Sequence, residues 1–220
     1  MAPKIVSRST LHRLPLYLNY LRSLSVDART TISATAIAAA LQLGEVQVRK
    51  DLASISVSGR PRIGYRISDL IEELMSFLGY ADRNDAVIIG TGKLGRALLD
   101  YAGFGDYGLN IVAGFDVDPF LTERTDGRKA VFSMEQFPDL CRRMKIQLGI
   151  LTVPAAVAQE TCDLMVEHGI RAILNFTPVH LRVPETVLVQ DVDIAAMLAV
   201  LSSRLLEYEN GMKIKGDQKR

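Results

Sequence analysis

A glycine-rich turn constrains the fold of this chain more than any other segment. Residues 86–89 read AVII, a run typical of a buried strand, and GTGKLG follows directly at 90–95. A second apolar strand is expected at 111–115 and ends in Asp116. Asp116 lies 21 residues after Gly95, near the spacing at which dinucleotide-binding folds place an acid on the adenosine ribose. The pattern predicts a parallel α/β domain of the Rossmann type.

Each glycine of this turn has its own expected task. Gly90 allows the tight turn, and Gly92 lets the backbone approach a pyrophosphate. Gly95 lets the next helix, expected over 96–101, pack closely on the strand. Asp116 would accept hydrogen bonds from the ribose hydroxyls and repel a 2′-phosphate, which favours NAD(H) over NADP(H). The predicted cofactor-binding residues of this region are Gly90, Thr91, Gly92, Lys93, Leu94, Gly95 and Asp116.

Strands and helices are expected to alternate through the following residues. Further strands are predicted at 148–152, 172–175 and 187–189, and helices at 135–144 and 155–167. Such alternation predicts a parallel sheet with right-handed crossovers. Because ligands of these sheets lie at the carboxyl ends of the strands, Thr152, Val153 and Pro154 are predicted to line the dinucleotide crevice, with Asn175 beside them.

The charges of the chain are divided unevenly between its two ends. Residues 1–66 hold ten Lys and Arg against three Asp and Glu, and residues 67–220 hold 16 against 22. The two net charges are therefore +7 and −6, which sum to the +1 of the whole chain. A basic segment beside an acidic one indicates a module that binds a polyanion, joined to a module with another task.

Short helices joined by a turn are expected in the basic segment. Pro15 is predicted to stand in the first turn of one helix. Ser33 is the expected N-cap of a second helix, over residues 34–43. A third is predicted from Val46 to about residue 55, after a turn that contains Gly44. Two helices joined by such a turn are typical of a helix-turn-helix module.

The third helix is the predicted recognition helix. Gln47, Arg49 and Lys50 face outward on it and are predicted to contact base edges and phosphates in the major groove of double-stranded DNA. Just beyond this helix, Arg60 and Arg62 lie where a hairpin tip is expected. Such a wing reaches phosphates or the minor groove. The five residues are the predicted DNA-binding set.

A linking helix separates the two modules. Asp69 is expected to cap a helix over 70–78 that ends at Gly79. The predicted domains are a winged-helix DNA-binding domain at 1–80, a Rossmann NAD(H)-binding domain at 81–192, and a C-terminal dimerisation helix with a polar tail at 193–220.

The C-terminal helix is predicted from about residue 194 to 209, with Asp193 as its N-cap. Its apolar stripe includes Ile194, Leu198 and Leu201 and needs cover over much of its girth. The helix packs either on its own sheet or into a second protomer. We favour a domain-swapped helix, because the DNA-binding prediction also calls for a two-fold homodimer.

Several segments are distinctive when they are read in order. They are LPLYLNYLR, VQVRKDL, GTGKLGRALLDYAGFG, GFDVDP, LTVP, NFTPVHLRVP and VQDVDIAAML. Together, from about Arg13 to Tyr208, they resemble the Rex family of redox-sensing transcriptional repressors. The resemblance implies a homodimer that holds its operator when NADH is scarce and releases it when NADH binds. The wing, SISVSGRPRIGY, differs from the YFGxFGTRGVGY of many members.

The resemblance also implies polar contacts that change between the ligand states. Asp193 is expected to bond Tyr101 in one state and Arg22 in the other, which would couple the cofactor to the DNA module. The nicotinamide ring is a cation when oxidised and neutral when reduced, so a dry wall would favour NADH. Ile194 and its apolar neighbours from a partner chain are predicted to form that wall. Tyr101 and Ile194 complete the predicted cofactor contacts.

Other functions are open to these residues. An NAD-dependent dehydrogenase fused to a helical module would use His180 as acid or base, but no substrate domain follows the last strand. A thiol sensor would use Cys141 and Cys162, which lack a nearby resolving cysteine. A coenzyme A-binding module shares the glycine turn and leaves the basic segment unexplained. We therefore expect a regulator and not an enzyme.

Composition excludes further classes. With 48% hydrophobic and 23% charged residues, the chain does not resemble a disordered one. Its apolar runs are shorter than the ~18 residues that span a bilayer, and MAPKIVSRST lacks the apolar core of a secretory signal. Two cysteines make no disulfide framework. We expect a cytoplasmic protein with no membrane partner and no metal site.

Overall fold

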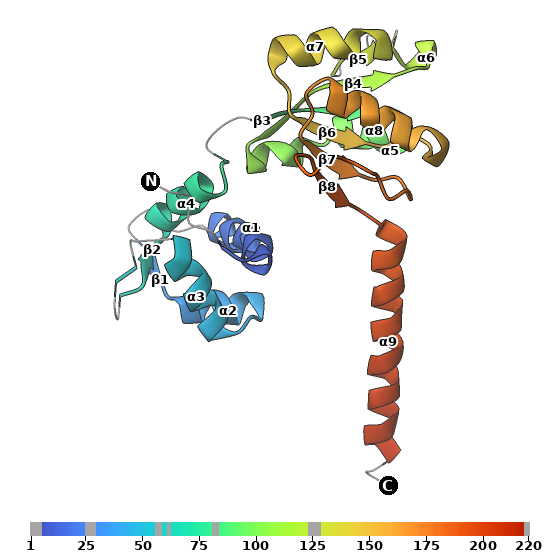
Figure 1. Cartoon of the computed structure of the whole chain (residues 1–220). Coiled ribbons are helices and arrows are strands. Elements are labelled where there is room, and N and C mark those ends of the chain that lie inside the picture. Colours follow the sequence, from blue (N-terminus) through green and yellow to red (C-terminus); the bar gives the residue numbers. More distant parts are fainter. Residues whose placement is uncertain are drawn as a thin grey trace. The chain divides into compact units, whose positions relative to one another are not determined.

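The computed structural model describes residues 6–24, 30–55, 59–60, 63–80, 84–122 and 129–217, with side chains described as far as residue 209. The chain divides into two compact units, Met1–Arg83 and Asn84–Arg220 (Figure 1). Each unit has hydrophobic clusters of its own.

The first unit is a helical domain with a two-stranded sheet. Its elements are α1 (Arg8–Ser23), β1 (Thr31–Ile32), α2 (Ala34–Leu41), α3 (Glu45–Ile55), β2 (Tyr65–Arg66) and α4 (Ile67–Phe77). The two strands pair antiparallel, and a bridge between Arg60 and Gly64 closes the hairpin turn that precedes β2. This is the winged helix-turn-helix arrangement that the sequence predicted.

One face of each helix enters a shared core. Its fully buried side chains come from every helix of the unit and include Leu14, Leu18, Ile37, Val48, Leu52, Leu70 and Leu74. The predicted cap of α2 is confirmed, because the Ser33 hydroxyl accepts from the Ala36 backbone N–H at 3.0 Å. The core therefore fixes α3 between α2 and α4.

The start of α1 differs from the prediction that Pro15 stands in its first turn. The helix begins at Arg8, and the Ser7 hydroxyl caps it by accepting from the Thr10 backbone N–H at 3.1 Å. Pro15 lies inside the helix, where it removes one backbone hydrogen bond. The helix continues through it because the apolar side chains on either side, Leu14 among them, are buried in the core.

The prediction that Asp69 caps α4 is also wrong. The helix begins at Ile67, because β2 runs directly into it. Arg66 occupies the N-cap without a side-chain capping bond, and Asp69 lies in the first helical turn, 3.9 Å from Arg66 Nε. Gly79 follows the helix with a φ of +72°, as expected of a glycine after a helix end.

The second unit is built on a six-stranded sheet in the order β5-β4-β3-β6-β7-β8. The strands are β3 (Asn84–Ile89), β4 (Leu109–Asp116), β5 (Val131–Ser133), β6 (Leu148–Leu151), β7 (Ala172–Asn175) and β8 (Leu188–Asp191). All neighbouring pairs are parallel. The order reverses between β3 and β6, so the carboxyl ends of these two strands bound the crevice in which such sheets bind ligands. The predicted Rossmann-like sheet is confirmed.

Helices cross between these strands. They are α5 (Lys93–Leu99), α6 (Pro119–Thr122), α7 (Phe137–Met144) and α8 (Ala158–Glu167), with the short 3-10 helices η1 (Ala102–Tyr107), η2 (Met134–Gln136) and η3 (Ala155–Val157). The sequence prediction started α5 at residue 96 and missed β5 and α6. These two elements have three and four residues, too few for a hydrophobic period to be recognised.

The C-terminal helix α9 (Ile194–Asp217) follows β8 and is longer than predicted (Figure 1). As far as residue 209, where its side chains are described, its large apolar side chains are more than half exposed, namely Ile194, Met197, Leu198, Val200, Leu201, Leu205, Leu206 and Tyr208. Among the described residues, no helix is long and apolar enough to cross a membrane. The helix thus offers an apolar strip that its own unit leaves uncovered.

Candidate functional site

The glycine-rich turn leads from β3 into α5. Gly90 has a φ of +88°, a conformation that glycine adopts without a Cβ clash. A Cβ on Gly95 would clash with the Gly90 carbonyl oxygen, so the helix and the turn need glycine to pack this closely. A Cβ on Gly92 would meet no atom within 4 Å. The space at Gly92 is therefore open, which fits the close approach of a dinucleotide pyrophosphate.

Asp116 ends β4 beside this turn. Its Oδ2 accepts from both the backbone N–H and the hydroxyl of Thr91, the latter at 3.1 Å. Its Oδ1 accepts from the Asp118 backbone N–H at 3.0 Å. Thr91 is buried and Asp116 is half-buried. Three bonds orient a carboxylate that has about four acceptor positions, so Oδ1 keeps acceptor capacity for a ribose hydroxyl.

Thr152 joins the end of β6 to the same turn. Its hydroxyl donates to the Gly90 carbonyl oxygen at 2.6 Å, and its backbone N–H donates to the Ile89 carbonyl oxygen at 2.9 Å. Val153 and Pro154 follow it at the carboxyl end of β6. The structure thus brings predicted cofactor residues together from three adjacent strand ends, those of β4, β3 and β6.

A cavity of about 390 Å³ opens where β7 and β8 end. Leu94 of the glycine turn lines it together with Asp193 and Ile194 of the α9 start. Asn175, fully buried, donates to Asp191 Oδ1 at 2.8 Å and ties the two strand ends together. The chain's own Ile194 therefore lies on a cavity that the glycine turn shares, whereas the sequence prediction drew this wall from a partner.

Tyr101 lies apart from this group. It follows α5, is 57% exposed, and packs edge-on against Phe104 with 5.3 Å between the ring centroids. Seven helical residues separate it from Gly92, a rise of ~10 Å along the helix. Within one chain, the structure does not bring Tyr101 to the glycine turn.

The other two residues of the predicted exchange lie on different units. Asp193 caps α9, because its Oδ1 accepts from the Ala196 backbone N–H at 2.8 Å, and this predicted cap is confirmed. Arg22 lies in the last turn of α1 in the first unit, where its Nη2 lies 3.2 Å from the Met75 sulfur. The exchange itself stays a prediction.

The residues of the alternative functions are poorly placed for them. Cys141 and Cys162 are buried, and burial raises the pKa of each thiol to about 11, so the reactive thiolate is scarce near neutral pH. The His180 side chain is 91% exposed and lies 3.7 Å from Asp191, without the dry surroundings of a catalytic acid or base. The described residues contain no group of His, Cys, Asp and Glu that could hold a metal ion.

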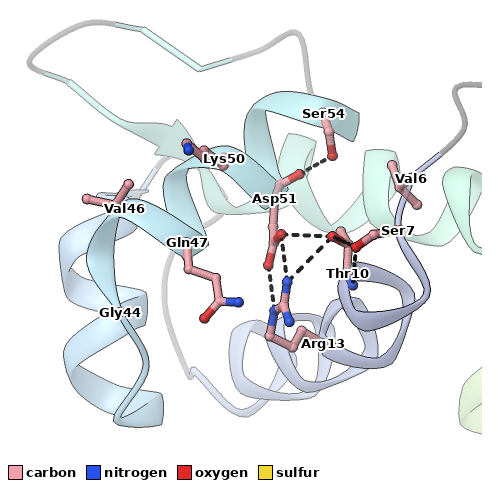
Figure 2. A pocket seen from close by; sticks show the side chains of 10 residues that line it. All are labelled: Val6, Ser7, Thr10, Arg13, Gly44, Val46, Gln47, Lys50, Asp51 and Ser54. Atoms are coloured by element: carbon pink, nitrogen blue, oxygen red, sulfur yellow. Dashed lines mark hydrogen bonds and ion pairs between the residues drawn. The ribbon is translucent and has the colours of Figure 1, made fainter.

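The predicted recognition residues lie on two sides of α3: Gln47 and Lys50 line one cavity, whereas Arg49 lines another together with Arg60 of the wing. Gln47, Arg49 and Lys50 are exposed, as the sequence predicted. Arg49 pairs with Glu45 one turn earlier. A surface cavity of about 660 Å³ runs along this helix, and its lining includes Gln47, Lys50 and Arg13 (Figure 2). The exposed side chains of α3 therefore offer hydrogen-bond donors and positive charges to a DNA duplex.

The wing adds a second cationic position. Arg60 is exposed, and its backbone N–H and carbonyl oxygen both bond Gly64 at 2.9 Å, which closes the hairpin turn. Arg60 and Arg49 line one cavity of about 430 Å³ together with Thr35 and Tyr65. The recognition helix and the wing therefore border the same groove. The predicted contact Arg62 lies outside the described residues.

A buried carboxylate that the sequence analysis missed holds α3 against α1. The Asp51 side chain is 6% exposed, and Arg13 donates to it from Nε at 2.7 Å and from Nη2 at 2.9 Å (Figure 2). The hydroxyls of Tyr17 and Thr10 donate to it at 2.8 and 3.0 Å. Every acceptor position of this carboxylate is thus filled by a side chain of α1.

These bonds keep the cluster charged. Burial, the largest single influence on Asp51, raises its pKa, but the hydrogen bonds from Arg13, Tyr17 and Thr10 outweigh it and the pKa is lowered. The hydrogen bond with Asp51 raises the pKa of Arg13. Burial, followed by the bond with Asp51, raises the pKa of Tyr17 to about 12. The cluster is therefore an ion pair flanked by two neutral donors.

The sequence did carry a signal for this cluster. Thr10, Arg13 and Tyr17 recur at spacings of three and four and so share one helix face. Asp51 falls between Val48 and Leu52, on the apolar face of the recognition helix. An acid at a core position requires donors from a neighbouring element, and such a face of donors supplies them.

Two family models match the chain. Residues 5–53 match a model described as "Putative DNA-binding protein N-terminus", which covers α1, α2 and most of α3. Residues 82–179 match a model described as "CoA binding domain", which covers β3 to β7 with the glycine turn. The two models divide the chain as the two units do.

Curated proteins are similar over nearly the whole length. A redox-sensing transcriptional repressor Rex from Porphyromonas gingivalis is 42% identical over 91% of this chain and 92% of its own length. Proteins of the same name from Bacteroides thetaiotaomicron and Treponema denticola are 40% and 38% identical, over 91% and 90% of this chain and 91% and 94% of their own lengths.

Solved structures agree with these relatives. The structure of RSP in complex with β-NAD⁺ and operator DNA matches with a TM-score of 0.86 and 35% identity, over 96% of this chain and 98% of that chain. The structure of RSP in complex with β-NADH matches with a TM-score of 0.83 and 34% identity, over 96% and 99%. A third structure, described as RSP, a Rex-family repressor, matches equally well.

Proposed function

The chain belongs to the Rex family of redox-sensing transcriptional repressors, and from this premise we propose which of its residues perform the task. It is a DNA-binding regulator that senses NADH and NAD⁺, and it is not an enzyme. It binds operator DNA when NADH is scarce and is released when NADH binds. Its site of action, we propose, is the cytoplasm, where operator DNA and the nicotinamide cofactors meet.

The cofactor is held, in our proposal, at the carboxyl ends of β4, β3 and β6. The residues Gly90 to Gly95 face the pyrophosphate, Asp116 accepts from the adenosine ribose, and Thr152 to Pro154 line the crevice. The observation that supports this most is the open space at Gly92 beside a carboxylate that Thr91 already orients. The same carboxylate would repel the 2′-phosphate of NADP(H).

Operator DNA contacts the first unit. We assign base-edge contacts to Gln47 and Arg49, and phosphate contacts to Lys50, Arg60 and Arg62. The groove shared by Arg49 and Arg60 supports this assignment, because a recognition helix and a wing that border one groove engage adjacent stretches of one duplex. Phosphate contacts supply affinity, and base contacts supply the choice of sequence.

The protein acts as a homodimer, and α9 is its proposed swapped element. The exposed apolar strip of this helix would be covered by insertion into the second protomer. Dimerisation also sets two recognition helices on the two half-sites of an operator.

The discrimination between NADH and NAD⁺ follows from desolvation. In our proposal the ring lies against the apolar side chains of Leu94 and Ile194, which suit its neutral reduced form, whereas burying an uncompensated cation costs several kcal/mol. Asp191 and Asp193 line the same cavity, so the discrimination requires that the ring stay on its apolar wall. Tyr101 would reach the cofactor from the partner chain, because within one chain it lies away from the glycine turn. Asp193 then exchanges Tyr101 for Arg22 and couples the cofactor to the DNA module.

A gel shift on promoter fragments tests this function. Wild-type protein is expected to shift a fragment in NAD⁺ and to release it in NADH. Asp193→Ala is expected to bind NADH by calorimetry and yet to hold its fragment. A wild-type protein that binds NADH without releasing DNA would contradict the sensor assignment, and an Asp193→Ala protein that releases normally would contradict the coupling alone.

A further inference from the structure

The outward face of α3 is tied to the buried cluster behind it. Gln47 and Asp51 are four residues apart on α3, so their side chains share one face of the helix. Arg13 of α1 lies between them and is mostly buried, with 17% of its side chain exposed (Figure 2). Gln47 itself is exposed and stands in the predicted DNA-binding set. One guanidinium therefore touches both the core and the recognition surface.

The two edges of this guanidinium serve different acceptors. Its Nε and Nη2 edge binds the Asp51 carboxylate. When the Gln47 amide is turned so that Oε1 faces Arg13, Oε1 accepts from Nη1 at 3.1 Å and from Nη2 at 3.2 Å. The opposite orientation would set the amide N–H₂ against a group that has only donors. The hydrogen-bond inventory therefore selects the first orientation.

Asp51 makes this selection firm. A carboxylate with a bidentate arginine fixes the plane of the guanidinium, and Tyr17 and Thr10 hold the carboxylate in turn. The second edge of Arg13 thus has a set direction before any DNA binds. We propose that Arg13 is a positioning residue that fixes the Gln47 amide, so that Gln47 presents only its N–H₂ donors to DNA and reads hydrogen-bond acceptors on the base edge.

This inference rests on the proposed function and deepens it. A glutamine with a free amide reads adenine with both ends, its oxygen on the N6 amino group and its nitrogen on N7. A glutamine whose oxygen is already bonded to arginine reads only acceptors, which are purine N7, guanine O6 and thymine O4. The donors adenine N6 and cytosine N4 then contribute nothing at this position.

The test uses the full-length protein and the duplex that it selects from a randomised pool without NADH. Every base pair is substituted in turn, and binding is measured for wild type and Gln47→Met, with Gln42→Met as a control at an exposed glutamine outside α3. The base pair whose substitution weakens wild type but not Gln47→Met is the one that Gln47 contacts. If no such base pair exists, the proposal is overturned.

Analogues that lack a single major-groove group are then placed at that base pair. Deleting an acceptor is expected to weaken wild type about three- to tenfold, the worth of one hydrogen bond, and Gln47→Met by less than about twofold. Deleting a donor is expected to change neither protein. A loss on deleting adenine N6 or cytosine N4, equal to the loss on deleting an acceptor, would overturn the proposal.

Two further variants test the role of Arg13 itself. Arg13→Lys keeps a cation against Asp51 but has no second planar edge for the amide, so donor deletion should now cost binding. Gln47→Glu keeps one oxygen on Arg13 and presents the other, so its preference should move from acceptors to donors. Thermal unfolding checks that the Arg13→Lys protein is folded. If that variant is unfolded, the base preference of Gln47→Glu tests the proposal in its place. A wild-type protein that binds no duplex at all would instead refute the proposed function.

Discussion

Two aspartates with different partners show how the two units use the same side chain. Asp51 in the first unit is buried, and donors from the side chains of α1 fill its acceptor positions. Asp116 in the second unit is half-buried, and its donors are Thr91 and one backbone N–H beside it. All acceptor positions of the Asp51 carboxylate are filled by side chains of its own unit. The Asp116 carboxylate, at the end of β4, keeps an acceptor position for a ligand.

This difference separates a structural role from a ligand-binding one. A buried charge must be fully paired, so a carboxylate saturated by its own unit stabilises the packing of two helices and has nothing left to offer a ligand. A half-buried carboxylate that is oriented mainly by a tight turn can keep an acceptor position unfilled at a lower cost in free energy. Burial together with the origin of the donors, rather than the residue type, distinguishes Asp51 from Asp116.

Alanine at Asp51 should produce the largest effect. It leaves the buried Arg13 cation without its partner, and removal of one member of a buried pair costs about 3–5 kcal/mol of the free energy of unfolding. Asp116→Ala, without cofactor, should cost less, about 1–3 kcal/mol, because it leaves the hydroxyl and backbone N–H of the buried Thr91 without their acceptor. Urea unfolding followed by circular dichroism measures both. Equal losses in the two variants would break the comparison.

Asp116→Ala should mainly lower the affinity for the cofactor. Loss of hydrogen bonds to a charged acceptor is expected to weaken the binding of NADH by about 1.5–3 kcal/mol. It is also expected to narrow the difference in affinity between NADH and NADPH. Calorimetry with both cofactors measures this, and Asp139→Ala, at an exposed acid of α7, is the matched control. Equal affinity of the wild type for NADH and NADPH would contradict the role of Asp116.

The pH dependence of stability should differ between the units. The pKa of Asp51 is lowered by folding, so its contribution is complete above the ordinary aspartate pKa of about 3.9 and is lost as pH falls through the folded-state pKa. The pKa of Tyr17 is raised to about 12, so the first unit loses stability as pH rises from about 10.

The second unit should weaken earlier on the alkaline side. The thiol pKa values of Cys141 and Cys162 are raised from 9.0 to about 11, so their contribution is complete below pH 9 and is lost above it. Unfolding free energy against pH measures each limb. Tyr17→Phe should make the alkaline limb of the first unit shallower, with Tyr65, whose pKa burial also raises, still contributing. A double Cys→Ala variant should flatten the limb of the second unit only.

The smallest expected effects come from a matched pair of threonines. Thr10→Val and Thr91→Val each remove one hydroxyl that donates to an aspartate, a change of about 1 kcal/mol. The first should lower the stability of the first unit without changing NADH affinity. The second should weaken NADH by about fivefold, because Asp116 is less firmly oriented. A Thr10→Val protein with impaired NADH binding would contradict the separation of roles.

Local patterns of the sequence predicted most of the fold. The apolar run before Gly90 and the cap at Ser33 are signals within a few residues, and both are present in the structure. Pro15 misled the prediction of α1, because the burial of distant side chains outweighs the local preference of proline for a first turn.

The buried cluster shows where such patterns end. Asp51 lies 38 residues from Arg13 and 34 from Tyr17 along the chain, and only packing of α3 on α1 brings them together. The orientation of the Gln47 amide depends on that cluster in turn. Residue types on one helix therefore predict which side chains face DNA, but not which of their atoms do.

The uncovered strip on α9 links the stability of the protein to its concentration. The described large apolar side chains of this helix are more than half exposed, so a partner that covers them stabilises the folded chain, and a second copy of the chain does so by mass action. Dilution should then lower the melting temperature as well as separate the protomers. A cell that keeps few copies of this repressor would hold less of it folded, so its dosage sets a threshold below which the genes it controls escape repression regardless of the NADH level.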